Sequence, residues 1–377
     1  MECEKLNRIE WVYPSLYNNL KLCFLKGAYI ENKFPPQLSR SPESVLGTVV
    51  HRMYELTSRG LISSLEEFDE KWDEELDLIE KGLRESSLEK GIVPIKDTAR
   101  DYEVKKEFCR LQINDNLKIK AGRRGKTESQ VYHLNQEEKI IIPEKSVKGK
   151  IDLVIKKGGY IEIIDYKTGN IFEKGSGGKK VKAEIVTQLI FYSGLYFFYH
   201  GVWPAKLSVM DQLGNRVNIP YSHADATELI ANAQCLMFSI NCILENTNIT
   251  EREKLHLLAR PSPTSCKFCN YRPSCYAYIN KKMTDTKSGW PTDIFIKIIR
   301  IDVPKSGLTT ITGRRIDTDK TVRIVNIPKE YLGNKFNPEK KISVFNLKIH
   351  FRAEDRYEWQ RNSLIATLPN LEILYSN

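Results

Sequence analysis

The chain has 377 residues, of which 41% are hydrophobic and 28% charged. This composition excludes a disordered or fibrous chain, and it provides enough apolar side chains for the cores of two globular domains. The formal net charge of +10 favours a polyanionic partner, with nucleic acid ahead of an anionic membrane.

Membrane and secretion signals are missing from the pattern. The N-terminal segment lacks the apolar run of a signal peptide, and no stretch contains the roughly 18 uninterrupted apolar residues that a spanning helix needs. We therefore expect a cytoplasmic protein without a membrane partner. In a reducing compartment, the eight cysteines are better interpreted as metal ligands and buried thiols than as disulfides.

The first 125 residues are predicted to be mainly helical. Pro42 suits the first turn of a helix and Gly60 suits its end, which predicts a helix over 41–60 with His51 in its middle. The charged segment 63–85 predicts another helix with a solvated face.

From about Thr127 the pattern changes to short strands. Segments 128–134 and 139–144 favour strands, and two further strands over 148–157 and 160–169 are joined by Gly158-Gly159, a strong hairpin signal. Apolar helices over 183–200 and 223–245 follow. The order of elements predicts an α/β core, with a mixed sheet flanked by helices.

The C-terminal part is predicted to be a separate domain. A polar run over 281–289 looks like a linker, so the domains are expected at 1–285 and 286–377. Strand patterns over 293–303, 321–328 and 341–353 predict a small β-barrel or sandwich. From Thr286 onward there are sixteen Lys and Arg against ten Asp and Glu. An OB-like nucleic-acid-binding barrel and a protein-interaction or packing module both fit this pattern.

The hairpin at Gly158-Gly159 carries the clearest chemical signal. A two-residue turn pairs residues whose numbers sum to 317, which places Asp152 opposite Asp165, with β-carbons roughly 4.5–5.5 Å apart. Lys167 follows two residues later, so it emerges on the same face. Two carboxylates this close favour a cation between them, and hard oxygen ligands favour Mg2+ or Mn2+. A solvated surface hairpin is the alternative, and the apolar neighbours of both aspartates weigh against it.

These segments resemble a known family. GKIDLVI, IIDYKTG and QLIFY resemble the core motifs of the PD-(D/E)XK nuclease superfamily in its RecB-like branch. The resemblance implies a restriction-endonuclease-like core, with Asp152 and Asp165 as metal ligands and Lys167 as the catalytic lysine.

The same resemblance implies further residues of the site. His51 and the backbone carbonyl of Tyr166 would be metal ligands, and Glu128 matches an acidic residue of the branch. Gln188 and Tyr192 match its QxxxY helix motif. Because they are four residues apart, they share one helical face and could hold the catalytic lysine or the DNA backbone.

A second group of residues is rich in cysteine. Cys266, Cys269 and Cys275 form a C-x2-C-x5-C run that requires a fourth ligand, and their spacing is compatible with zinc or with an iron-sulfur cluster. RecB-like nucleases with a cluster staple, such as AddB-type and CRISPR-adaptation exonucleases, have one cysteine far upstream. The resemblance thus implies a 4Fe-4S cluster with Cys23 as fourth ligand, and Cys3 is the alternative.

The other three cysteines, Cys109, Cys235 and Cys242, are expected in the core. The leading functional hypothesis is a DNA exonuclease or end-processing nuclease that acts on single-stranded or unwound DNA in repair, recombination or defence against foreign DNA. The resemblance also implies a helicase or other protein partner, and none of the ATP-binding motifs is present in this sequence. The alternatives are a non-catalytic DNA-binding or scaffolding subunit of a helicase-nuclease complex and a zinc-stabilised RNA-processing nuclease.

Overall fold

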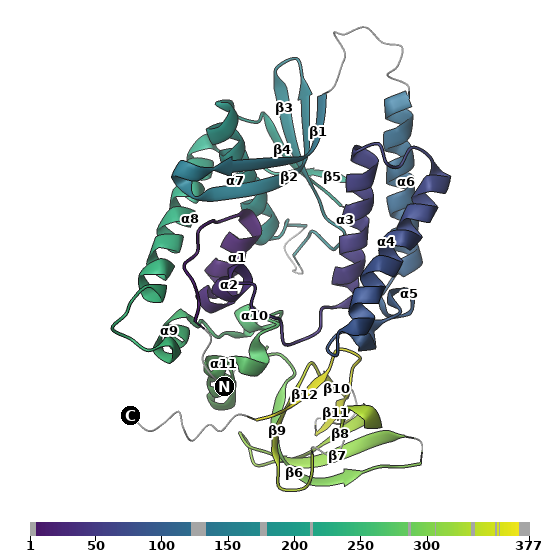
Figure 1. Cartoon of the computed structure of the whole chain (residues 1–377), viewed down its shortest axis with the longest axis vertical. Helices are drawn as coiled ribbons and strands as arrows, with labels where there is room; N and C mark the ends of the chain where they lie inside the picture. The colour runs from purple at the N-terminus through teal and green to yellow at the C-terminus, as the bar shows by residue number, and fades with distance from the viewer. Residues whose placement is uncertain are drawn as a thin grey trace. The chain divides into compact units, whose positions relative to one another are not determined.

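The computed structural model describes residues 5–121, 133–173, 179–211, 214–285, 288–305, 307–332, 336–350, 353 and 355–368, and the structural statements that follow concern these residues. The chain divides into two compact units (Figure 1). The first comprises residues 1–34, 41–86 and 93–258, and the second comprises 35–40, 87–92 and 259–377. The cysteine run thus groups with the C-terminal strands. The expected domain boundary near residue 285 stays a prediction.

The helical N-terminal part of the first unit follows the sequence pattern closely. Its helices are α1 (Pro14–Leu22), α2 (Phe24–Glu31), α3 (Pro42–Ser58), α4 (Leu65–Glu85), α5 (Ile95–Thr98) and α6 (Tyr102–Ala121). The side chain of Ser41 caps α3 by accepting a hydrogen bond from the Ser44 amide, with Pro42 in the first turn. Gly60 follows that helix with φ +74°. The helices expected over 41–60 and 63–85 are therefore confirmed.

The sheet of the first unit contains five strands in the order β1-β2-β3-β4-β5. They are β1 (His133–Ile142), β2 (Val147–Lys157), β3 (Tyr160–Tyr166), β4 (Lys206–Met210) and β5 (Arg216–Asn218). Strands β3 and β4 run parallel and the other neighbours are antiparallel. This mixed sheet, flanked by helices, confirms the expected α/β core.

The hairpin register is the one that the turn predicted. Pairs run from Lys157 opposite Tyr160 to Leu153 opposite Ile164, and both turn glycines adopt positive φ. One strand differs from expectation: β1 continues without a break through residues 135–138, because it pairs with β2 from His133 to Ile142. The backbone hydrogen bonds to β2 stabilise the extended conformation of residues 135–138, although their polar side chains had indicated an interruption.

The remaining helices of the first unit are α7 (Ala183–His200), α8 (His223–Leu244) and α9 (Glu251–Leu258). Helix α7 packs along strands β1 to β4, and α8 packs on α7. Gly194 allows that close approach, because a β-carbon there would lie 3.0 Å from the Ala226 carbonyl oxygen. By length and composition α8 could cross a membrane, with a mean hydropathy of 1.3. This is a weak indication, since apolar helices in the cores of soluble proteins pass the same test.

The second unit combines short helices with a seven-stranded sheet. The helices are α10 (Pro263–Cys266) and α11 (Tyr276–Thr284), and the strands are β6 (Ile294–Asp302), β7 (Leu308–Arg315), β8 (Thr321–Pro328), β9 (Lys341–Phe345), β10 (Lys348–Ile349), β11 (Arg356–Glu358) and β12 (Leu364–Thr367). Their order is β10-β11-β8-β7-β6-β9-β12. The expected C-terminal β-strands are thus present, with no pairing between β10 and β12 among the described residues.

The prediction of a linker over 281–289 is wrong for its first residues, 281–284. Residues 281–284 form the last turn of α11, and the Lys282 ammonium donates a hydrogen bond to the Pro291 carbonyl at 2.9 Å. The helix is held there because Tyr278 and Ile279 are fully buried in one core cluster with Phe295 and Phe345. The polar residues of this run gave no sign of it, because the buried side chains that hold the helix, Tyr278 and Ile279, precede the run.

Candidate active site

The predicted catalytic residues lie at the end of strand β3 and on the elements around it. Asp165 is the penultimate residue of β3, and Lys167 follows the strand. Asp152 belongs to β2, and Gln188 and Tyr192 belong to α7. The structure therefore collects residues from three elements that are separated by up to forty positions.

The side chain of Gln188 contacts three other residues of this site. Its amide oxygen accepts a hydrogen bond from Lys167 Nζ at 3.0 Å, and its amide nitrogen donates to Asp165 Oδ1 at 3.1 Å and to Tyr192 Oη at 3.0 Å. Lys167 Nζ also lies 2.6 Å from Asp165 Oδ2. One helical side chain thereby orients the acid and the base of the strand end.

Asp152 joins the site through the backbone of β3. Its Oδ2 accepts a hydrogen bond from the Tyr166 amide at 2.9 Å, one residue beyond Asp165. The strand ladder ends at the pair Leu153–Ile164, one residue before the predicted pair of Asp152 with Asp165, so that pair stays a prediction. The two aspartates are close enough for their charges to interact.

The electrostatic state of Asp165 reflects its burial. Its side chain is 1% exposed, and this burial raises the pKa of the carboxyl group above its ordinary value. Lys167 and His51 lower the pKa of Asp165, while the negative charge of Asp152 raises it further. Tyr192 is also buried, which raises the pKa of its phenol and keeps it a neutral hydrogen-bonding group. The positive charges of Lys167 and His51 therefore offset only part of the effect of burial and of the Asp152 charge on Asp165.

The donor set fits a hard divalent cation. Asp165 Oδ2 is buried and has no partner in hydrogen-bonding geometry among the described residues, although the Lys167 ammonium lies beside it. Asp152 supplies a second carboxylate, and His51 lies on the exposed side of α3. Carboxylate oxygens of this kind suit Mg2+ or Mn2+. Within the described ranges, however, no three His, Cys, Asp or Glu side chains are already gathered as metal ligands.

Glu128 and Cys3 lie outside the described residues. The remaining predicted ligands of the cluster fall in both units: Cys23 stands between α1 and α2, and the run from Cys266 to Cys275 belongs to the second unit. Cys266 is buried, while Cys269 and Cys275 are partly exposed. Thiols suit zinc or iron, but these cysteines too are outside any gathered group of three ligands among the described residues.

Of the cysteines expected in the core, only Cys109 is buried. Cys235 and Cys242 are exposed on α8, because its buried face is formed by Ala226, Ile230, Ala233, Ile240, Asn241 and Leu244 instead. The expectation for these two residues was wrong.

Sequence reasoning missed the arginine that organises the cysteine run. Arg272 is 2% exposed, and its guanidinium donates to the carbonyl oxygens of Cys266 at 3.1 Å and Cys269 at 2.8 Å. The same group pairs with Asp293 at 2.7 Å. An arginine inside a cysteine run is a visible signal, but its partner stands 21 residues away in an unremarkable position before β6.

A mixed sheet flanked by helices, with an aspartate and a lysine at the end of one central strand and a second aspartate on the neighbouring strand, is consistent with a restriction-endonuclease-like core. A comparison with protein families matches residues 24–276, about two thirds of the chain. The chain belongs to the PD-(D/E)XK nuclease superfamily. Nucleic acid is therefore its substrate class, and phosphodiester hydrolysis is the reaction of its family.

Comparison with solved structures gives remote likenesses. The crystal structure of SSO0001 is 18% identical over 48% of this chain and 80% of that chain, with a TM-score of 0.20. The crystal structure of protein VC1899 from Vibrio cholerae is 13% identical over 62% of this chain and 58% of that chain, with a TM-score of 0.19. The chain thus spans less than two thirds of VC1899. No curated protein matches the chain.

Proposed function

We propose that this chain is a metal-dependent deoxyribonuclease whose reaction takes place at Asp165 and Lys167. The observation that carries the proposal is the contact chain in which Gln188 holds both of these side chains and is itself held by Tyr192. Such a chain of contacts holds an acidic and a basic side chain in a fixed relative position, which hydrolysis of a phosphodiester requires.

Each residue has a definite role in this proposal. Asp152, Asp165, His51 and the Tyr166 carbonyl would hold Mg2+ or Mn2+. The cation, when bound, polarises the phosphodiester and lowers the pKa of a bound water. Lys167 orients the attacking water or stabilises the charge that develops on the phosphate. Gln188 and Tyr192 position Lys167, and Glu128 is assigned a further acidic role from the resemblance alone.

The preferred substrate is single-stranded or unwound DNA, cleaved from an end. The net charge of +10 supports a polyanionic substrate, and the RecB-like motifs support an exonuclease of repair, recombination or defence that works with a helicase or other partner in the cytoplasm. A scaffolding subunit with a degenerate site is disfavoured, because Asp152, Asp165 and Lys167 are all intact.

The test is digestion of matched single-stranded DNA, duplex DNA and RNA, labelled at either end, with Mg2+ or Mn2+. The parent should shorten the single strand progressively, and Lys167→Ala should not. Lys139→Ala is the matched control, since Lys139 is exposed on β1. If Lys167→Ala cleaved as fast as the parent, the assignment of the site would be wrong, and preferential cleavage of RNA would favour the RNA-processing alternative.

We further infer a structural 4Fe-4S cluster on Cys23, Cys266, Cys269 and Cys275. The inference rests on thiolate chemistry and on the resemblance, and no step of the reaction is assigned to the cluster. Anaerobically purified parent protein should be brown and contain iron, while Cys23→Ser should lose the absorbance. Cys242→Ser is the control, because Cys242 is exposed on α8. Stoichiometric zinc without iron would replace the cluster with a zinc site.

A further inference from the structure

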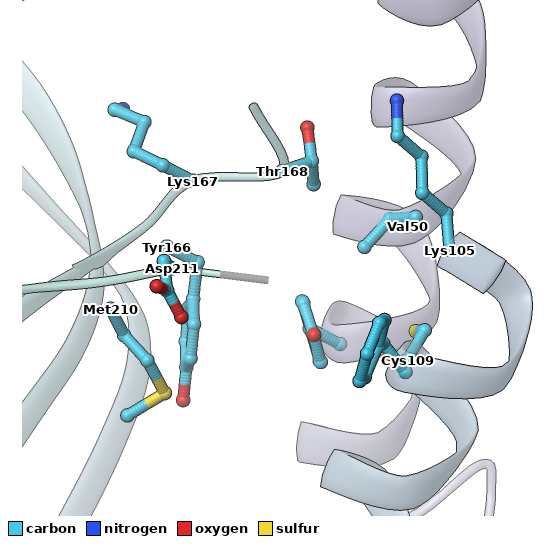
Figure 2. A pocket seen from close by; sticks show the side chains of 10 residues that line it. Val50, Lys105, Cys109, Tyr166, Lys167, Thr168, Met210 and Asp211 are labelled. Carbon is cyan, nitrogen blue, oxygen red and sulfur yellow. The ribbon is translucent and has the colours of Figure 1, made fainter. Parts of the chain in front are cut away.

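A pocket of the first unit includes Lys167 in its lining, and its remaining side chains have no assigned part in the proposed reaction. It lies between helices α3 and α6 on one side and the ends of β3 and β4 on the other (Figure 2). Its lining includes three aromatic rings, those of Tyr54, Phe108 and Tyr166, and two lysines, Lys105 and Lys167. An aromatic, cation-lined pocket beside a phosphodiesterase centre calls for a ligand of matching chemistry.

The aromatic wall is fixed in place. Tyr54 stacks on Tyr166, with ring centroids 4.8 Å apart and an interplanar angle of 21°. The Tyr54 hydroxyl donates to the side-chain oxygen of Gln112, whose amide nitrogen donates to the Asp211 carbonyl at 3.3 Å. These contacts tie α3, α6 and the ends of both strands together, so the aromatic wall is held in one position.

The other lining groups are unsuited to catalysis or metal binding. Burial raises the pKa of the Cys109 thiol, which keeps it protonated and makes it part of the apolar wall. The carboxylate of Asp211 is engaged within its own turn, where it accepts from the Asn215 amide at 2.9 Å and from its side chain at 3.0 Å. The pocket therefore offers flat apolar surface and positive charge.

The positive charge is placed at two walls. Figure 2 shows Lys105 on the helical wall and Lys167 on the strand wall, both extending toward the same side of the pocket. Lys167 is committed to Asp165 and Gln188, which leaves Lys105 as the cation that can meet a second anionic group. A nucleotide within a strand combines a flat base with one phosphate on each side of its sugar, and this matches an aromatic wall with two nearby lysines.

We propose that this pocket receives the base of the nucleotide next to the scissile phosphate, with Lys105 contacting the following phosphate. The assignment of the scissile phosphate rests on the proposed function. A base that enters the pocket must leave its neighbours in the strand, which costs less in single-stranded or frayed DNA than in a duplex. The pocket thus selects unpaired ends by stacking, without reading sequence.

The experiment measures stacking directly and without cleavage. Short single-stranded oligodeoxynucleotides carry one 2-aminopurine, moved along the strand, and are titrated with the protein in Ca2+. One position should show strong fluorescence quenching on binding. Phe108→Ala should remove that quenching and weaken binding about tenfold, as expected for one stacked base. Leu111→Ala is the matched control, since Leu111 is 48% exposed on the same helix.

Lys105→Gln provides a second variant that leaves the core intact. It should weaken binding and lower its salt dependence while the quenching at saturation persists, whereas Lys118→Gln on the same helix should do neither. Cleavage of DNA by the parent without quenching at any position would overturn the pocket and leave the nuclease in place. Quenching that depends on Phe108, without cleavage in Mg2+ or Mn2+, would support the pocket and overturn the proposed activity.

Discussion

Replacement of Asp293 by alanine should destabilise the second unit strongly. Asp293 is 1% exposed and accepts hydrogen bonds from Arg272 Nε at 2.7 Å, from the Asn346 amide at 2.9 Å and from the Tyr278 hydroxyl. Without this carboxylate, the buried Arg272 keeps its charge and loses its counter-ion. Removal of one partner of a buried pair costs about 3–5 kcal/mol. At roughly 4 °C per kcal/mol, the melting temperature should fall by about 12–20 °C.

The matched control is Asp302→Ala. Asp302 lies on β6 and also pairs with an arginine, Arg300 at 3.0 Å, but its side chain is 41% exposed and that of Arg300 is 66% exposed. Such a surface pair contributes about 1 kcal/mol or less. Calorimetric melting of the parent and both variants gives the comparison, and the double change Arg272→Met with Asp293→Leu should recover much of the loss. If both alanine variants melted at the same temperature, the reasoning about the buried pair would be refuted.

The same contacts alter how the C-terminal strands should be tested. Arg272 donates hydrogen bonds to the carbonyls of Cys266 and Cys269. Under the proposal of an iron-sulfur cluster, Asp293→Ala should therefore also lower the iron content of the purified protein. A deletion from residue 286 would remove Asp293 together with the strands. Loss of DNA binding by such a truncation would then report unfolding as much as loss of charge, and substitutions on the surface are the cleaner experiment.

Three further results are expected. Asp165→Asn should reduce metal-dependent cleavage by at least about 100-fold, because it removes a proposed metal ligand. It should not lower the melting temperature of the metal-free protein, because burial raises the pKa of the Asp165 carboxyl group and so disfavours its charged form. Unchanged turnover would exclude Asp165 as a ligand. Gln188→Leu should lower kcat by about 10–100-fold with little change in KM, because Lys167 loses its acceptor; a change confined to KM would assign Gln188 to DNA binding. Joint substitution by glutamine of three exposed tail lysines, Lys305, Lys320 and Lys348, should flatten the dependence of DNA affinity on salt by about 0.7 per lost phosphate contact; an unchanged slope would favour a protein-binding or packing role for these strands.

Local sequence determined the elements that the site is built on. A two-residue turn at Gly158-Gly159 fixes which residues of β2 and β3 face each other, so these two glycines determine the pairing of the strands. Capping and periodicity likewise determined α3, and apolar continuity determined the limits of α7 at Ala183 and His200. These signals are short-range, which is why a single sequence reveals them.

The sequence also indicated the chemistry of the site through residue types. Asp152, Asp165 and Lys167 stand out because the two strands of one hairpin carry two carboxylates, with a lysine directly after the second strand. The spacing of Gln188 and Tyr192 showed that they share a helical face. The spacing did not show that Gln188 contacts both Asp165 and Lys167, because these contacts depend on how α7 packs on the sheet.

Tertiary structure alone decided the long-range polar partners. Arg272 and Asp293 are 21 residues apart, and neither neighbouring pattern marks them as a buried pair. The stacking of Tyr54 on Tyr166 joins residues of α3 and β3. Burial also decided which charges matter, because the penalty for an unpaired charge depends on the protein that surrounds it and not on its neighbours in the chain. Sequence thus specified the strands, helices and reactive groups of this protein, while packing specified which groups meet.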